Sequence, residues 1–355
     1  HFTSVNGVNR NRIARLNSDG SVDDTFNPGG GANNPILDML VQPDGRTVIV
    51  GDFSSFNGVS RKGVARINSD GTLDETFGLG DGPDFSVHAV VMQRDGRVII
   101  AGDFKNYDGV ACEGVVRLNP DGSIDKSFNS ALGFDDSVRC IALQEDGRIV
   151  IGGFFSHVGN AARGRIARLN PDGSLDADFA IGAGADGSIY SMAIQSDGKI
   201  LVGGSFSHFN GLSRNGLVRL TESGGIDPTV NFGAGANGSV LDIEIRPNFK
   251  VLIAGGFTTF NGENRDHFAQ LHGGIMNGSG RLEFLSSVYE VGETGTNAVV
   301  SLVRQGGLAG TVSVNFETQL SSNPSPAVPG LDYEHTSLKL QFPEGEVLQT
   351  VEVPI

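Results

Sequence analysis

The residues best suited to hold a ligand form one column of the sequence, repeated every 51 positions. The column contains a histidine, an arginine and a tyrosine, which together offer charge, hydrogen-bond donors and an aromatic face. We therefore predict that His88, Arg139 and Tyr190 bind a ligand; the alternative is that they are solvated positions without a role. The variable column consists of Leu37, His88, Arg139, Tyr190 and Leu241, and the uniformly apolar column before it consists of Ile36, Val87, Val138, Ile189 and Val240.

Two glycine-rich segments match the spacing of a dinucleotide-binding loop, but their context differs. Gly182–Gly187 and Gly233–Gly238 are each followed by a strand-like run, whereas a nucleotide phosphate needs a helix N-terminus after the glycines. We interpret them as connections between repeats. None of the 7 histidines has metal-ligand spacing. No Ser-His-Asp or Cys-His pattern stands out, so we predict that the protein is not an enzyme; a triad assembled only in space stays open.

Acidic and amide residues repeat with a spacing that partly resembles a calcium loop. Asn119-x-Asp121-x-x-x-Asp125 lacks the oxygen ligand at position five and the glutamate at position twelve that complete such a loop. Asn and Asp also favour tight turns by bonding their own backbone, which is our interpretation. Arginines recur in step with aspartates, which predicts stabilising ion pairs within each repeat. The pairs are Arg15 with Asp23, Arg66 with Asp74, Arg117 with Asp125, Arg168 with Asp176, and Arg219 with Asp227.

The composition excludes some partners. The 355 residues include 41 Asp and Glu against 26 Lys and Arg, for a net charge of -15. So acidic a chain is unsuited to nucleic acid or to anionic membrane surfaces, and is compatible with calcium or with a salty exterior. Cys112 and Cys140 either stay free and buried or form one bridge. No apolar run reaches the ~18 residues of a membrane span. No signal peptide is present, although the sequence opens within a repeat and we expect the polypeptide to begin further upstream.

Three markers share the 51-residue step and define the elements that carry these side chains: Asn17–Gly20 and its copies, the Asp-Gly pairs beginning at Asp44, and the phenylalanines beginning at Phe2. Each period contains four strand-like runs. Two Asp-Gly pairs join them as hairpins, because glycine accepts a positive φ without penalty. Four antiparallel strands in a unit of this length predict a β-propeller blade, with both faces buried against neighbouring blades. In the second period the runs are Val87–Met92, Val98–Phe104, Gly114–Leu118 and Ile124–Phe128.

The number of blades depends on how the ring closes. Five inner hairpins are complete, whereas the outer strand typified by Ile13–Leu16 occurs six times, last as Phe268–Leu271. We expect Val22–Phe26 to supply the outermost strand of the last blade and to close a five-bladed ring at residues 1–272. The alternative is a larger propeller with more blades upstream of His1.

The most regular part of the repeat is an L-N-x-D-G-S-[ILV]-D-x-x-F segment, such as Leu118–Phe128, accompanied by Gly-x-Phe and Phe-Asn-Gly elements within Gly51–Gly58. These motifs resemble the delta-60 repeat, a bacterial β-propeller repeat of unknown function. The resemblance covers the propeller region and implies a large secreted or cell-surface protein, often with adhesion-type modules. It carries over no catalytic residues.

After Leu271 the markers stop, and a Gly-rich linker at residues 273–281 leads to a second domain at residues 282–355. Runs at 282–284, 299–304, 311–317, 337–342 and 349–353 predict an immunoglobulin-like β-sandwich. Tyr289–Glu293, Val303–Gly307, Gly330–Glu334 and Phe342–Glu346 together resemble the Calx-beta domain, incomplete at its C-terminus. That resemblance implies a partial calcium site at Glu293 and Asp332, so we expect calcium as a cofactor of a longer protein. The alternative is that both are turn residues.

The two predicted domains favour a structural or binding role over catalysis. Longer loops, such as Gly133–Ser137 and Ser54–Lys62, fall on the propeller side away from the Asp-Gly turns, and function usually resides on such loops. We predict a non-enzymatic structural or adhesion module of a larger bacterial protein, extracellular or at the cell surface. Its partners would be other domains or subunits of that assembly, without nucleic acid and without membrane insertion. The alternative is a lectin-like propeller that binds a glycan on its long-loop face, and a propeller enzyme is a third hypothesis.

Overall fold

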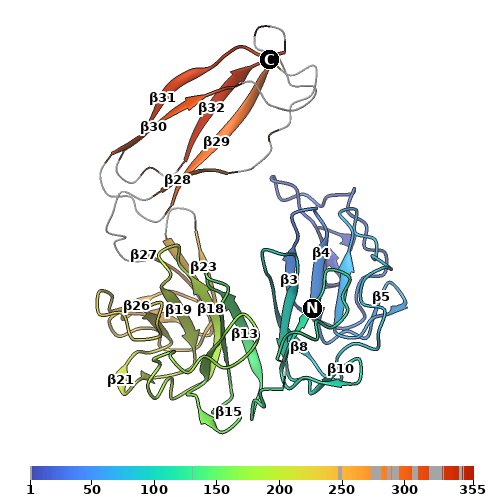
Figure 1. Ribbon diagram of the computed structural model, residues 1–355, viewed down its shortest axis with the longest axis vertical. Helices are drawn as coiled ribbons and strands as arrows, with labels where there is room; N and C mark the ends of the chain where they lie inside the picture. Colours follow the sequence, from blue (N-terminus) through green and yellow to red (C-terminus); the bar gives the residue numbers. More distant parts are fainter. Residues whose placement is uncertain are drawn as a thin grey trace. The chain divides into compact units, whose positions relative to one another are not determined.

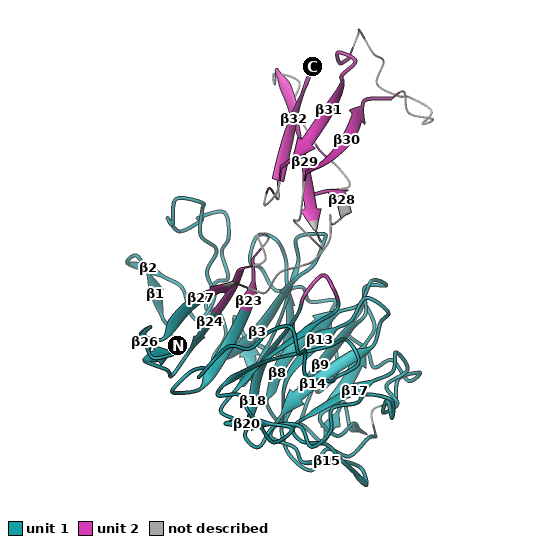
Figure 2. Ribbon diagram, turned by 90° about the vertical axis from the view of Figure 1, so that its left-hand side faces the viewer, with its two compact units in different colours: residues 1–194, 198–243, 253–269 teal, residues 195–197, 244–252, 270–355 magenta. Residues whose placement is uncertain are grey.

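The computed structural model describes residues 2–129, 131–246, 250–272, 281–285, 289, 296–305, 311–319, 330, 332–343, 346 and 348–355. Within these residues every regular element is a β-strand, which confirms the all-β prediction (Figure 1). Two compact units are distinguished. Residues 1–194, 198–243 and 253–269 form the first, and residues 195–197, 244–252 and 270–355 form the second (Figure 2).

Three-stranded sheets recur with the repeat and form the inner part of each blade, the second strand lying between the first and the third. The first strands are β3 (Ile36–Val41), β8 (Val87–Met92), β13 (Val138–Leu143), β18 (Ile189–Ile194) and β23 (Val240–Ile245). The second strands are β4 (Thr47–Gly51), β9 (Val98–Gly102), β14 (Ile149–Gly153), β19 (Ile200–Gly204) and β24 (Lys250–Gly255). The third strands are β7 (Val64–Ile67), β12 (Val115–Leu118), β17 (Ile166–Leu169), β22 (Leu217–Leu220) and β27 (Phe268–His272).

In the first four of these blades the fourth run is shorter than the sequence suggests and forms a single bridge to the third strand. These bridges join Ile67 to Leu73, Leu118 to Ile124, Leu169 to Leu175, and Leu220 to Ile226. Small hairpins connect the second strands to the third strands: β5 (Ser55–Phe56) with β6 (Val59–Ser60), β10 (Asn106–Tyr107) with β11 (Val110–Ala111), β15 (His157–Val158) with β16 (Ala161–Ala162), β20 (His208–Phe209) with β21 (Leu212–Ser213), and β25 (Thr259–Phe260) with β26 (Glu263–Asn264). A sixth such hairpin, β1 (Ser4–Val5) with β2 (Val8–Asn9), stands ahead of the first complete blade.

The expected closure of the ring through Val22–Phe26 is wrong. Val22 bridges Leu16 of its own segment, and among the described residues no bridge joins it to β27, which ends its sheet. The backbone of this segment is already committed, because the Asp23 amide donates to the Arg15 carbonyl and the Asn27 amide donates to the Asp70 carbonyl. Val22–Phe26 therefore belongs with its own hairpin and with the turn of the first complete blade.

Both faces of the inner strands of the middle blades are buried against neighbouring blades, as β9 shows. In β9, Val98 and Ile100 lie in one core cluster with Val48 and Val50 of the preceding blade. Ile99, between them, lies in another cluster, with side chains of the following blade. Fully burying such a side chain stabilises the fold by about 1.5–3 kcal/mol. This alternation explains why apolar residues occupy both parities of these strands.

Three buried repeat arginines, Arg66, Arg117 and Arg168, each hold two blades together. Arg117 pairs with Asp125 of its own blade at 2.8 Å. Its Nη1 also donates to the carbonyl of Pro171, in the turn of the next blade, at 2.7 Å. The guanidinium lies over the Phe128 ring. The predicted pairing within each repeat is therefore present, and the same side chain bonds to the next blade, which sequence spacing did not indicate.

The second unit contains two sheets at its C-terminal end. β28 (Arg281–Phe284), β29 (Asn297–Gln305) and β32 (Leu348–Pro354) form one sheet, and β30 (Val312–Glu317) pairs with β31 (Ser337–Phe342) in the other. The strands agree with the predicted runs. Their shared core contains Leu302, Phe316, Leu340, Phe342, Val351 and Val353. The predicted linker largely falls outside the described residues.

The cysteine alternatives are resolved. Cys112 and Cys140 are both buried and free, and burial raises the pKa of each thiol, that of Cys112 to about 12. No helix in the described part of the chain is long and apolar enough to cross a bilayer.

Candidate ligand-binding site

A β-bulge sets the direction of each residue in the predicted ligand column. The register between β8 and β9 shifts between Val87 and Ala89, on either side of His88. The same shift brackets Arg139 in β13 and Tyr190 in β18. A bulged residue faces no partner on the next strand, and its side chain is re-aimed. All three side chains are partly exposed, while the residue before each is fully buried.

His88 is held by Asp103, at the end of the second strand of the same blade. Its Nε2 lies 2.8 Å from Asp103 Oδ2. The Ser137 hydroxyl of the next blade donates to the other carboxylate oxygen of Asp103. Burial raises the pKa of Asp103, but hydrogen bonds from Ser137 and His88 and the nearby Arg139 charge outweigh it, so this pKa lies below its usual value. Asp103 therefore stays ionised and joins two blades.

Arg139 connects His88 to Tyr190. Its Nη1 lies 3.3 Å from His88 Nδ1. Because a guanidinium can only donate, Nδ1 accepts and Nε2 carries the proton that is donated to Asp103. The guanidinium also lies over the Phe154 ring, 4.5 Å from its centroid, and Phe154 meets Tyr190 edge to face at 5.7 Å. The three predicted residues thus form one continuous row of contacts across three blades.

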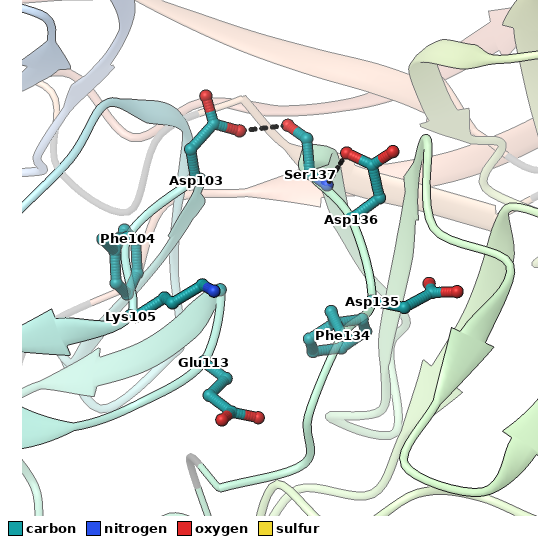
Figure 3. Close-up of a pocket in the computed structure, with 10 residues that line it drawn as sticks. Asp103, Phe104, Lys105, Glu113, Phe134, Asp135, Asp136 and Ser137 are labelled. Carbon is teal, nitrogen blue, oxygen red and sulfur yellow. Dashed lines mark hydrogen bonds between the residues drawn. The ribbon is translucent and has the colours of Figure 1, made fainter.

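Asp103 and Ser137, which hold His88 in this row, also line a pocket of about 300 Å³ (Figure 3). Asp103, Asp136 and Ser137 line one part of it, and Lys105 and Glu113 line another. Asp136 accepts the Ser137 amide at 2.7 Å. Charged and hydroxyl groups thus surround the cavity, with the aromatic rings of Phe104 and Phe134 among its walls.

Asp135, also at the pocket, has a structural task that is repeated around the propeller. One carboxylate oxygen accepts the backbone amides of Ser156 and His157 at 2.8 and 2.9 Å, which caps the β15 hairpin. Asp84 caps the β10 hairpin in the same way through Lys105 and Asn106. Asp135 therefore shapes the loop of the β15 hairpin.

The arrangement suits binding through polar and aromatic contacts. Ser137, Asp103 and His88 are neighbours, but Asp103 lies between the hydroxyl and the imidazole. In a nucleophilic triad the imidazole contacts the hydroxyl directly and accepts its proton. Here Ser137 donates to the carboxylate and His88 Nε2 does the same. The three side chains therefore position one another and leave Arg139, Tyr190 and the pocket walls for a ligand.

Sequence reasoning missed Asp103, Ser137 and Phe154. Asp103 and Phe154 occupy one column, directly after the second strand, which continues as Ser205 in the next repeat. That column varies as much as the His88 column. The shared variation was a signal from which contact between the two columns could have been predicted. Their contact was not predictable, because it depends on the bulge that turns His88 toward the end of the neighbouring strand.

The predicted calcium residues are not brought together in what the structure describes. Glu293 lies outside the described residues, and Asp332 is exposed beside the Tyr333 bridge. Among the residues that the structure describes, no group of three or more His, Cys, Asp or Glu side chains could hold a metal ion. The calcium site stays a prediction.

Repeated blades followed by a separate pair of sheets define the class: a β-propeller repeat protein with an appended β-sandwich domain. Two family models assign both parts. The beta-propeller domain of unknown function DUF5122 matches residues 1–26, 42–77, 93–128, 144–179 and 195–229, and the Calx-beta domain matches residues 276–355. The chain thus carries five DUF5122 β-propeller repeats and a Calx-beta domain, which confirms the resemblances seen in the sequence.

Solved propellers are similar only at the level of the fold. The WD40 β-propeller domain of Doa1 is 14% identical with a TM-score of 0.43; the match covers 63% of this chain and 61% of that domain, less than two thirds of its length. XC5397, a gluconolactonase from Xanthomonas campestris, is 17% identical over 69% of this chain and 75% of that one, with a TM-score of 0.44. The extracellular domain of BT4673 from B. thetaiotaomicron is 12% identical over 81% and 41%, with a TM-score of 0.40. With TM-scores this low, they carry no argument about function. No curated protein matches the chain.

Proposed function

We propose that this chain is a non-enzymatic structural and adhesion module of a larger extracellular bacterial protein, and that it holds its ligand at the His88–Arg139–Tyr190 row. The observation that carries the proposal is the row itself. Three different side chains, each released from strand packing by a bulge, are linked through Asp103 and Phe154 beside a polar pocket. Binding modules acquire specificity by presenting variable side chains at one place on a rigid scaffold.

Bonds between blades support a structural role for the scaffold. Three buried arginines bond their own blade to the turn of the next, as Arg168 does with the Glu222 carbonyl at 2.7 Å. A propeller joined in this way keeps its loops in fixed positions, which lowers the entropic cost of binding. The partners would be other domains or subunits of the same surface assembly.

A glycan is the second candidate for the ligand, favoured by the chemistry of the row. Sugars present apolar C–H faces together with many hydroxyls, and their sites combine aromatic rings with charged hydrogen-bonding groups. Tyr190 and Phe154 supply rings next to the Arg139 guanidinium. Asp103 and Asp136 supply acceptors at the adjoining pocket.

The experiment is a binding screen of the full chain against a glycan array and against proteins of the bacterial surface. The variant His88→Ala/Arg139→Ala/Tyr190→Ala is expected to lose at least tenfold in affinity for any ligand found, about 1.4 kcal/mol. Leu37→Ala is the matched control, since Leu37 occupies the same column and is 43% exposed. Unchanged affinity in the triple variant would retire the site. Turnover of a bound glycan would replace the proposal with an enzymatic one, and recovery of the native protein from the cytosol would refute its extracellular role.

A further inference from the structure

One backbone conformation recurs just before the third strand of every repeat, although the residue there differs between repeats. The φ angle is positive at each copy, between 60° and 84°, a region that residues other than glycine seldom adopt. Arginine nevertheless stands at two of the copies. The position is occupied by Arg12, Gly63, Gly114, Arg165, Gly216 and His267.

Both arginines reach from this position to the loop that leads into the next blade. Arg165 Nη1 donates to the carbonyl of Ala185 at 3.0 Å, and Arg12 Nη1 donates to the carbonyl of Ala32 at 2.8 Å. Ala32 and Ala185 are copies of one loop position. We call the space between these two positions the interblade slot. The chain itself therefore places a guanidinium group in two copies of the slot.

The pocket of about 300 Å³ is the copy of this slot that begins at Gly114. Gly114 takes the place of Arg165, and Phe134 takes the place of Ala185; both line the cavity. Because glycine has no side chain, the space that a guanidinium group fills in the next blade stays open here. The Phe134 ring lies 3.3 Å from where a Cβ on Gly114 would stand, and an aromatic ring at this distance can stack on a planar cation.

The charges around this copy of the slot suit a cation. Among the described residues that line the cavity, four carboxylates outnumber one lysine, Lys105. Glu113 and Asp136 are exposed and come from segments of adjacent blades (Figure 3). Asp136 accepts the Ser137 amide with one oxygen, and no side chain in the described part of the chain donates to its other oxygen or to Glu113. Two carboxylates therefore have acceptor capacity left for a ligand.

The other two glycine copies lack this combination. At Gly63, the Pro83 side chain comes within 2.8 Å of where a Cβ would stand, so the proline crowds the slot. At Gly216, Asn215 and Gly238 stand where the pocket has its two exposed carboxylates. Of the three glycine copies, the one at the pocket alone combines open space with acceptors of full negative charge.

We propose that this pocket binds a guanidinium group of a ligand, in the place that the chain's own arginine takes in the next blade. The N–H groups of the guanidinium donate to Glu113 and Asp136. A planar cation with five donors matches two carboxylates and an aromatic ring better than a point-like ammonium does. The group belongs to an arginine side chain of a partner protein or to a small guanidino compound. The inference deepens the proposed function and rests on it for the partner, because Asp103 and Ser137 belong both to the pocket and to the contacts that hold the ligand row.

The test titrates the full chain with capped arginine, Nα-acetyl-arginine N-methylamide, and follows the amide NMR signals of Gly114 and Ser137. We expect saturable shifts, and binding about tenfold weaker for capped citrulline, which keeps the shape of arginine without its charge. Equal binding of the two probes, or no saturable shift with capped arginine, would overturn the proposal. Free arginine separates the sources of the group. Capped arginine that binds at least as tightly assigns it to a protein side chain, and tighter binding of free arginine assigns it to a small compound.

A pair of charge-matched variants locates the binding. Glu113→Gln/Asp136→Asn removes both carboxylates at exposed positions and is expected to weaken the binding of capped arginine about tenfold. Glu75→Gln/Asp81→Asn makes the same change of charge at exposed residues that do not line the pocket, and is expected to bind as the parent does. Equal weakening in both variants would overturn the proposal, because overall charge alone would then explain the binding.

A further variant fills the slot from within. Gly114→Arg/Phe134→Ala recreates in the pocket the arginine and alanine of the next blade, and is expected to keep the circular dichroism of the parent and to lose the binding of capped arginine. A folded variant that still binds the probe would contradict the proposal. The readout uses the amides of the pocket alone, so a failure here leaves the outcome of the ligand screen at the His88–Arg139–Tyr190 row unaffected, and the reverse also holds.

Discussion

Arg168 offers the sharpest test of how the blades are held together. Its side chain is 3% exposed and pairs with Asp176, 8% exposed, at 2.8 Å. Its Nη1 donates to Gln144 Oε1 and to the Glu222 carbonyl at 3.1 and 2.7 Å. Arg168→Met keeps most of the volume and removes every one of these bonds. The variant therefore leaves a buried carboxylate whose closest remaining cation is Arg148, 4.0 Å away and 41% exposed.

The expected loss follows from that uncompensated charge. Removing one partner of a buried ion pair costs about 3–5 kcal/mol, and the partial contact with Arg148 favours the lower end. Arg15→Met is the matched control, because Arg15 holds the same repeat position and pairs with Asp23 at the same 2.8 Å distance but is 41% exposed. Solvent screens this exposed pair, so Arg15→Met is expected to cost much less than Arg168→Met.

The assay is urea unfolding followed by circular dichroism, with the slope of the transition used to check that the folded states are equally compact. The double variant Arg168→Met/Asp176→Asn is expected to recover part of the loss in stability, since no buried charge remains at this position. The side-chain amide oxygen of the asparagine can still accept the hydrogen bond from the Asp178 backbone amide. Both arginines also donate to a carbonyl of the next blade's turn, so the two variants differ in burial. Equal losses in the Arg168 and Arg15 variants would refute the reasoning, because they would show that burial of the pair contributes nothing.

Two further predictions concern titratable groups. Hydrogen bonds from Thr25, then the Arg15 pair, lower the pKa of Asp23 to about 2, and the pKa values of Asp125, Asp176 and Asp227 are lowered as well, where hydrogen bonds and arginine charges outweigh burial. A carboxylate whose pKa is lower in the folded state than its unfolded value of about 3.9 stabilises the fold at pH values above the unfolded pKa. This stabilisation is lost as the pH falls toward the folded pKa. The urea midpoint is thus expected to be flat from pH 7 to 5 and to fall between about pH 4 and 2; a midpoint unchanged at about pH 2 would contradict this. Burial raises the pKa of the Cys112 thiol to about 12 and also raises that of Cys140, so neither should react with a thiol reagent at about pH 8 until urea unfolds the chain. Rapid labelling of either cysteine in the folded protein would contradict their burial.

The ion pairs were predictable from sequence because they are local. Arg117 and Asp125 lie on adjoining strands joined by an Asp-Gly turn, so their spacing alone brings them together. The bond from Arg117 to the Pro171 carbonyl spans 54 positions. This bond depends on the position of the next blade's turn, which the spacing of residues within one repeat does not predict.

The failed prediction of ring closure has a related cause. The sequence shows that Val22–Phe26 has the pattern of a fourth strand, but a pattern does not specify which third strand it joins. Local pairing with Leu16 across the Asn17–Gly20 turn is available immediately. A short loop costs far less entropy to close than a contact with β27, almost the whole propeller away along the chain. The local partner was therefore favoured.

The bulge explains why one column of the repeat could diversify while its neighbours could not. Val87 is fully buried and its register partner is Gly102, so a larger or polar residue there would disturb the packing of two blades. His88, one position later, has no partner on β9 and lies outside the interblade core. A substitution at this place changes the chemistry at the end of the strand with little cost to the fold. His88, Arg139 and Tyr190 can therefore differ from one another without disturbing the fold. The uniformly apolar column before them is constrained by packing between blades, and the bulge frees the next position from that constraint.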